Sequence, residues 1–446
     1  MDKLANILNR LRQSLWIVPG AMGAAAAVLA WFLLSSRFED IVTDPSAKWW
    51  LFSGDAGTAR DLLSALLSGL ITMTSLVVSI TMVVLSLAAG QLGPRLILNF
   101  IRDRQIQLVL GLFMGTIVYT LLVLRSVSDE LGPKAIPHIA VAVASALTLI
   151  CLFALLFFVH KIARSIIADT VVRQVADELE AAIAKASPHR REPQTQDAIS
   201  KSFNVRTPVA MGVAGYIQVI DYAQLVELAT EHDVVIEAQV RAGHFVLRGG
   251  EHFKILSNGP VPAKLPDDLR KAIVIGPERT STQDLEYSVR QLVEIAVRAL
   301  SPGVNDPFTA LAVVNRLGAA LECAAARADP PAVRVDDEAV VRVKAKVTNF
   351  VGLLDASFNQ IRQAAAGNAA VLIQTSDTLG QLAVVVDDPA GRAGLYAHLQ
   401  KIERAAARGL SDPADLHDFT ASANETRKRL AATGLAALSD GVQNDA

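Results

Sequence analysis

Hydroxyl side chains recur at helical spacing along one charge-free stretch of this sequence, which makes them the first candidates for chemistry. Six of them, between positions 64 and 86, follow one another at spacings of 4, 4, 3, 4 and 7. At about 100° per residue, they fall within an arc of roughly 80° on one face of a helix. An aspartate extends this arc at its start. We call the set the polar stripe: Asp61, Ser64, Ser68, Thr72, Ser75, Ser79 and Ser86.

The polar stripe has two interpretations. Polar groups that replace the hydration of ions line membrane pathways, and an acidic residue at the mouth, here Asp61, favours cations. Small hydroxyl residues also let helices approach closely and bond across the contact, which describes a seam between helices. The two interpretations are compatible where the seam surrounds the axis of an oligomer.

A second concentration of polar residues surrounds two predicted helix starts between positions 278 and 306. The candidates for a ligand site or a subunit contact are Glu278, Arg279, Asp284, Arg290, Asn305 and Asp306. A helix N-terminus attracts anions, and the two arginines would complete such a site. The same residues also suit a network of caps, turns and salt bridges, with Asp306 as N-cap and Pro307 as the first helical residue. A structural network, an oligomer contact and a ligand pocket therefore remain open.

Enzymatic and metal chemistry have little support in the sequence. No Walker loop, G-x-S-x-G or H-E-x-x-H motif is present. His232, His244 and His252 match no metal-ligand spacing, and Cys151 and Cys323 are the only cysteines. We expect a protein that is not an enzyme and that has neither a cofactor nor a metal.

The elements that must position these residues begin with membrane helices. The chain has 446 residues, of which 52% are hydrophobic and 19% are charged, and its mean hydropathy is +0.36. A run of roughly 20 apolar residues crosses a bilayer as a helix. Four stretches lack Asp, Glu, Lys and Arg and predict four transmembrane helices: Leu15–Ser36, Leu62–Pro94, Gln105–Leu124 and Ala135–His160.

The distribution of basic residues predicts the orientation of these helices. Lysine and arginine accumulate on cytoplasmic loops. Three lie before the first stretch, three between the second and third, and three after the fourth: Lys3, Arg10, Arg12, Arg95, Arg102, Arg104, Lys161, Arg164 and Arg173. The connection between the first and second stretches also has three, but it is longer and carries four acidic residues, Glu39, Asp40, Asp44 and Asp55. We expect both termini in the cytoplasm.

The remainder of the chain predicts a cytoplasmic α+β part. The segment VRAGHFVLRGGEHFKIL resembles the hairpin of biotinyl and lipoyl barrel domains, but no attachment lysine follows, so only the shape is expected. Helices are expected at about 336–366, 368–385, 389–409 and 412–434. The predicted divisions are an amphipathic N-terminal arm (1–14), a four-span transmembrane domain (15–160), a helical stalk (161–187), a linker (188–204), a β-rich, barrel-like module (205–275), a helical domain (276–435) and a flexible tail (436–446).

Three long segments carry a resemblance to a known family. They are GPERTSTQDLEYSVRQLVEIAVRALSPGVNDPFTAL, QLGPRLILNFIRDRQIQLVLGLFMGTIVYTLLVLR and GYIQVIDYAQLVELA. They resemble an uncharacterised bacterial family of predicted membrane proteins, domain of unknown function number two-two-five-four. The resemblance covers roughly residues 10–435. It implies a bacterial inner-membrane protein with four spans and a cytoplasmic domain, and it supplies no reaction.

The function expected from these patterns is transport. We expect a homo-oligomeric ion channel or permeation pathway, lined by the second span and assembled or gated by the cytoplasmic domain. The alternative is a membrane-anchored sensor or scaffold whose cytoplasmic domain binds a partner or an anionic ligand. The expected partners are the lipid bilayer, further copies of the chain and small ions. A net charge of −2 disfavours nucleic acid as a partner.

Overall fold

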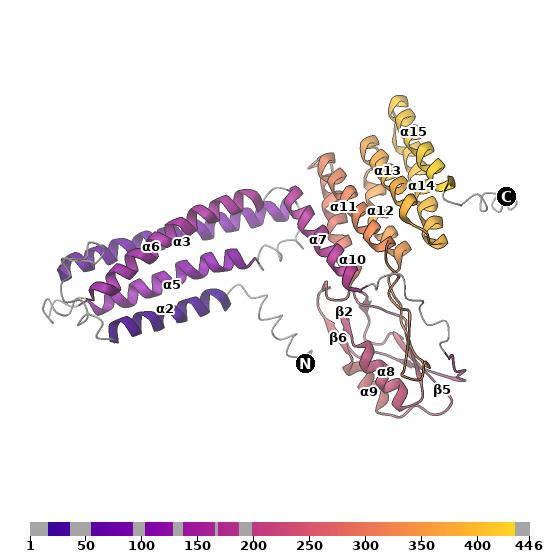
Figure 1. Cartoon of the computed structure of the whole chain (residues 1–446), viewed down its shortest axis with the longest axis horizontal. Coiled ribbons are helices and arrows are strands. Elements are labelled where there is room, and N and C mark those ends of the chain that lie inside the picture. Colours follow the sequence, from indigo (N-terminus) through magenta and orange to yellow (C-terminus); the bar gives the residue numbers. More distant parts are fainter. Residues whose placement is uncertain are drawn as a thin grey trace. The chain divides into compact units, whose positions relative to one another are not determined.

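The structure is a computed structural model of the whole chain, and it describes residues 17–35, 55–91, 103–127, 137–165, 168–186 and 199–432. It divides into two compact units, Met1–Thr170 and Val171–Ala446, which we call the first unit and the second unit. Their elements are labelled in Figure 1. The predicted N-terminal arm and the predicted tail lie outside the described residues.

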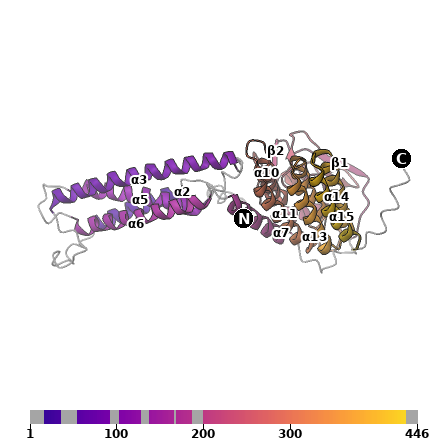
Figure 2. The same ribbon diagram turned by 90° about the horizontal axis from the view of Figure 1, so that it is seen from above.

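The first unit contains four long helices that lie side by side: α2 (Ile17–Ser35), α3 (Ala56–Gln91), α5 (Arg104–Ser126) and α6 (His138–Ser165). Figure 2 shows α3 reaching beyond its neighbours. With 36 residues, α3 is about 54 Å long at 1.5 Å per residue, which exceeds the roughly 30 Å of a bilayer core. Its contacts within the unit are with α5 and α6.

Close contact between α2 and α5 depends on two glycines of α5. A Cβ atom at Gly111 would lie 2.5 Å from the sulfur of Met22 and 3.3 Å from the Cα atom of Pro19. At Gly115 it would lie 3.2 Å from the carbonyl oxygen of Met22. Small residues at this spacing allow two membrane helices to approach each other's backbones. The two residues form a G-x-x-x-G pattern, which is visible in the sequence.

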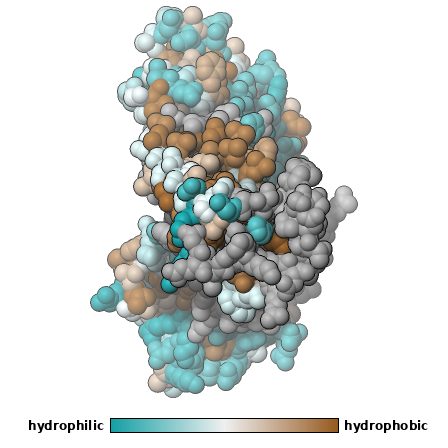
Figure 3. All heavy atoms as spheres, turned by 90° about the vertical axis from the view of Figure 1, so that its left-hand side faces the viewer, coloured by the Kyte–Doolittle hydropathy of each residue, from teal (hydrophilic) through white to brown (hydrophobic). Residues whose placement is uncertain are grey.

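Five described helices are long and apolar enough to cross a membrane. They are the four helices of the first unit and α11 (Pro307–Ala325) of the second unit. Large apolar side chains such as Trp31, Phe153 and Leu156 are exposed on the helices of the first unit. Brown patches in Figure 3 show exposed apolar side chains on the face turned toward the viewer.

The second unit begins with a mixed α/β part that contains two sheets. The larger sheet has the order β1-β5-β3-β8-β7, with bounds Val205–Val209, Phe253–Ser257, Val235–Ala238, Val341–Lys344 and Val333–Val335. The smaller has the order β4-β2-β6, with bounds Phe245–Val246, Gly215–Ile220 and Ile273–Gly276. Both sheets contribute to one apolar core with α8 (Tyr222–Glu231) and α9 (Leu265–Lys271). The described strands do not close into the predicted barrel, because each sheet keeps two free edges.

Two strands arise from a part of the chain predicted to be helical. The expected helix at 336–366 is wrong in its first part, since β8 is a strand and α12 begins only at Phe350. Val341 and Val343 are buried, and β8 pairs in parallel with β3. Burial beside a strand about 105 residues away in the chain decides the conformation, which local periodicity does not reveal.

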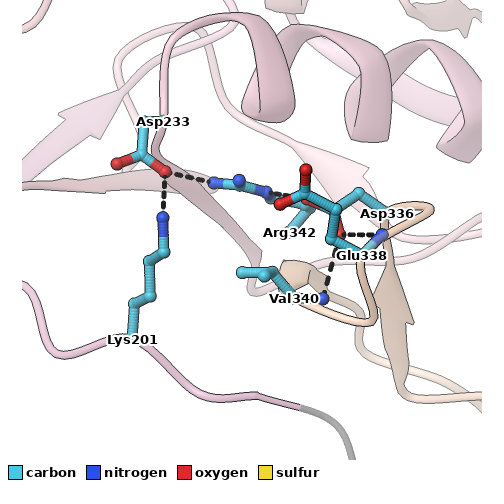
Figure 4. A network of polar contacts seen from close by, with 6 residues as sticks. All are labelled: Lys201, Asp233, Asp336, Glu338, Val340 and Arg342. Atoms are coloured by element: carbon cyan, nitrogen blue, oxygen red, sulfur yellow. Dashed lines mark hydrogen bonds and ion pairs between the residues drawn. The ribbon is translucent and has the colours of Figure 1, made fainter.

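One buried arginine joins β7 and β8 to the turn that precedes β3 (Figure 4). The side chain of Arg342 is 5% exposed and donates to Asp336 at 2.6 Å and to Asp233 at 2.7 Å. Lys201 donates to the same oxygen of Asp233 at 2.6 Å. Asp336 also accepts from the backbone N–H groups of Glu338 and Val340. Because every member has a partner, we interpret this network as structural.

Helices make up the rest of the second unit. They are α7 (Ala168–Ala186), α10 (Leu285–Ala299), α11, α12 (Phe350–Ala364), α13 (Ala369–Val385), α14 (Pro389–Gly409) and α15 (Pro413–Leu430). Five of them start at a side chain that accepts a backbone N–H bond, namely Asp306, Asn349, Asn368, Asp388 and Asp412. Such caps satisfy N–H groups that the helix itself leaves free.

Candidate functional site

The polar stripe faces outward from the first unit. All of its residues, from Asp61 to Ser86, are exposed. From Leu63 onward the buried residues of α3 are spaced seven apart, and Leu63, Leu70 and Val77 are fully buried. At 100° per residue, the centre of the stripe lies about 170° from the centre of this buried face.

No described helix of the chain covers the polar stripe, because α3 contacts α5 and α6 through its apolar face. Exposed apolar residues border the stripe on both sides, with Ile71, Val78 and Met82 along one edge and Leu76, Val83 and Leu87 along the other. The stripe is therefore not a seam between described helices of one chain.

Two hydroxyls of the stripe bond to the backbone of α3 itself. Ser68 donates to the carbonyl oxygen of Ser64, and Thr72 to that of Ser68, each at 2.9 Å. These bonds satisfy the donor, but the lone pairs of both hydroxyl oxygens remain available to water, to an ion or to another helix. The surface is a row of small acceptors on an otherwise apolar helix.

In the second unit, Arg279 and Asp284 form a buried ion pair just before α10. The guanidinium of Arg279 donates to Oδ2 of Asp284 through Nε at 2.7 Å and through Nη2 at 2.5 Å, and the aspartate side chain is 0% exposed. Burial raises the pKa of Asp284, and Arg279 opposes that rise. Gly243 lies against the pair at a φ of +86°, and a Cβ atom there would lie 2.1 Å from the carboxylate.

A second ion-pair cluster centres on Glu286. This side chain is 9% exposed and pairs with Arg241, which lies 45 residues earlier in the chain. Arg290 donates to its other oxygen at 3.3 Å, and the side chain of Arg290 is 47% exposed. Glu286 therefore ties the loop after β3 to the first turns of α10.

The remaining predicted residues lie apart from these pairs. Asp306 is the N-cap of α11, as predicted, and accepts from the backbone N–H of Thr309 at 3.2 Å and from its hydroxyl at 2.5 Å. Asn305 has a φ of 49°, in the left-handed region. Glu278 is exposed, and its carbonyl oxygen accepts from Gln218 at 2.9 Å. The structure thus distributes the six candidates over separate clusters rather than one pocket.

The comparisons with known proteins agree with this architecture. Residues 12–381 match the family described as "Predicted membrane protein (DUF2254)". The chain belongs to this family. An uncharacterized protein of Mycobacterium tuberculosis and one of Mycobacterium bovis are each 29% identical over 427 residues, which cover 93% of this chain and 80% of the relative. No solved structure matches the chain.

The DUF2254 match includes the polar stripe, both ion-pair clusters and the start of α11, and it ends within α13. Sequence analysis missed Arg241 and Glu286, since only the fold brings these two residues together. Among the described residues, no group of three or more His, Cys, Asp or Glu is placed to hold a metal ion.

Burial lowers the pKa of His244 to about 4, and the charges of Arg241 and Lys346 act in the same direction.

Proposed function

We propose that this DUF2254 protein forms a homo-oligomeric pathway for small ions across the bacterial inner membrane. In this proposal the α3 helices of several copies turn their polar stripes toward a common axis. The observation that carries the proposal is the exposure of the whole stripe, from Asp61 to Ser86, opposite the buried face of α3. No described helix of the same chain meets it.

The proposal assigns the membrane to α2, α3, α5 and α6, with both termini in the cytoplasm. The fifth apolar helix, α11, packs against α10, α12 and α13 of the second unit. It has a mean hydropathy of 1.3, compared with 2.0 to 2.7 for the four helices of the first unit. A helix that already has helical neighbours in an α/β unit has less apolar surface left for lipid.

Physical chemistry favours an axis over lipid as the environment of the stripe. Hydrocarbon chains offer nothing that binds the free lone pairs of six hydroxyl groups, whereas water or a second stripe donates hydrogen bonds to them and cations coordinate them. Small side chains also allow α3 helices to approach one another closely. Asp61 would place one negative charge per copy at the outer mouth, which attracts cations.

Flux measurement on the whole protein tests the proposal. We would reconstitute the purified chain in liposomes and follow potassium efflux, with a Ser68→Leu/Thr72→Leu/Ser75→Leu variant beside it. We expect efflux from the natural protein and its loss in the variant. A matched control, Met82→Leu/Val83→Leu, changes exposed apolar residues of the same helix and should leave efflux unchanged.

Oligomeric state is the second measurement on the same samples. Native mass spectrometry should give one defined oligomer for the natural protein and for both variants. A monomer throughout, or efflux that the triple variant leaves unchanged, would overturn the proposal. Efflux that falls equally in the Met82→Leu/Val83→Leu control would also count against a stripe-lined pathway.

A second candidate function is that of a membrane-anchored sensor or scaffold. The observation in its favour is the exposed surface beside α10 and α11, where Phe308 is 79% exposed and Val304 is 42% exposed. The side chain of Arg290 is also accessible. In this candidate a specific partner co-purifies with the natural chain and is lost in a Phe308→Ser/Arg290→Ala variant. If no partner co-purifies reproducibly with the natural chain, this candidate function is wrong.

A further inference from the structure

A cleft in the second unit gathers positive charge that its own lining does not neutralise. Its volume is about 430 Å³. Four basic residues line it, namely Lys185 of α7, Arg241, Arg334 of β7 and Lys346. No aspartate or glutamate is among its lining residues. The cleft was not foreseen from the sequence, because its basic residues are spread over about 160 positions.

Most of these cations are not paired within the described chain. Arg241 has Glu286 as its partner. By contrast, Lys185, Arg334 and Lys346 form no ion pair with any described acidic residue. Unpaired cations that share a concave site repel one another, and a bound anion removes that cost.

Arg334 is the most constrained of the four. Its guanidinium lies over the ring of Tyr222, 4.2 Å from the ring centroid. The Nε atom of Arg334 is buried and has no hydrogen-bond partner. Burial lowers the pKa of Arg334, and Tyr222 opposes that decrease. A buried donor on a cation without an acceptor is costly, and Arg334, which lines the cleft, carries a charge that a bound anion would offset.

The charges of these basic residues also affect the pKa values of two neighbouring groups, Tyr222 and His244. Burial raises the pKa of Tyr222, whereas the charges of Arg334 and Arg241 oppose that rise. Beside the cleft, burial lowers the pKa of His244, and Arg241 and Lys346 add to the effect. Arg241 therefore affects both pKa values, together with Arg334 at Tyr222 and together with Lys346 at His244. All three cations line the same cleft.

The rest of the lining suits an organic ligand rather than a bare ion. Leu285 and Val347 supply apolar wall next to Tyr222, whose ring lies under the guanidinium of Arg334. The hydroxyl residues Ser281 and Thr282 add hydrogen-bonding groups. Small-molecule sites are typically concave, largely apolar and about 300–1,000 Å³ in volume, with a few polar groups that orient the ligand.

We propose that this cleft binds a small organic anion that carries a diphosphate group, of the nucleoside diphosphate class. The four basic side chains match a ligand with several negative charges, and arginine recognises phosphate oxygens through its fork of donors. The organic part of the ligand would lie against the apolar wall of Leu285 and Val347. The site is separate from the polar stripe and does not depend on the pathway proposed above.

Binding measurements on the full chain in detergent test this site. We would use isothermal titration calorimetry with ADP, pyrophosphate and inorganic phosphate as probes, at constant ionic strength. ADP is expected to bind most tightly, pyrophosphate more weakly and inorganic phosphate weakest. Arg334→Gln and Lys346→Gln should each weaken ADP binding by about tenfold, which is the loss of one charge-assisted contact.

The matched control is Lys344→Gln, an exposed lysine two residues from Lys346 that does not line the cleft. It should bind ADP like the natural protein. No binding of ADP, or equal weakening by Lys344→Gln and Lys346→Gln, would overturn the proposal, and equal affinity for ADP and inorganic phosphate would overturn the organic part of it. Because no flux is measured, failure of the proposed pathway leaves this result interpretable.

Discussion

Polar side chains are exposed on α3 of the first unit, whereas several in the second unit are buried and paired. In the first unit α3 buries its apolar residues and exposes the polar stripe. In the second unit charged residues turn inward and find partners, as Asp284 does with Arg279 and Asp336 with Arg342. In each unit one polar surface is where another molecule is expected: the stripe, whose hydroxyl oxygens keep free lone pairs, in the first unit, and the basic cleft in the second.

The contrast also exists inside the first unit, between α3 and α5. Both helices are apolar and carry several hydroxyl residues. In α5, however, Gln107, Thr116 and Thr120 are buried, and the glycines of α5 admit the backbone of α2. The number of hydroxyl residues in a helix therefore does not predict whether its polar face is buried or exposed. The packing of neighbouring helices determines this.

The largest predicted effect follows from the loss of a buried ion pair in the second unit. Arg279→Ala leaves the fully buried carboxylate of Asp284 without its cation, and we expect a loss of about 3–5 kcal/mol in the free energy of unfolding. Arg290→Ala removes a half-exposed partner of Glu286 and should cost about 1 kcal/mol or less. Denaturant unfolding of the detergent-solubilised chain measures both. Equal losses for the two arginines would show that burial does not distinguish the clusters.

An intermediate effect is expected where α2 meets α5. Gly111→Val would push a side chain into Met22 and Pro19, and overpacking of this kind costs about 1–3 kcal/mol. The matched control is Gly69→Val on α3, because nothing lies within 4 Å of a Cβ atom at Gly69. Thermal unfolding in detergent should separate the two variants. A Gly69→Val variant that is destabilised as much as Gly111→Val would contradict the outward orientation of that part of α3.

The smallest predicted effect concerns pH. His244 has a pKa of about 4 in the folded protein, whereas an unperturbed histidine has a pKa of about 6.5. Between these values the unfolded chain binds a proton that the folded chain does not, so stability falls as the pH decreases from about 6.5 to about 4. In His244→Gln this part of the slope should disappear, as measured by the melting temperature across that range. The same slope in His244→Gln would show that another group causes it.

Several local features of the fold could be predicted from the sequence alone. Charge-free stretches such as Gln105–Leu124 predicted long helices, and α5 runs from Arg104 to Ser126. The spacing of the polar stripe defined one helix face, and the Asp-Pro pair correctly predicted the start of α11. These features follow from interactions within a few residues, such as backbone hydrogen bonds, caps and helical periodicity.

The tertiary structure decided what the local pattern leaves open. Only packing against α5 and α6 shows that the polar stripe points away from the chain. Only the fold brings Arg241 to Glu286, places β8 beside β3, and collects Lys185, Arg334 and Lys346 around one cleft. These arrangements depend on residues from about 45 to 160 positions apart. Charge pairing stabilises the contact of Arg241 with Glu286, and burial stabilises that of β8 with β3. Neither interaction leaves a periodic signal in the sequence.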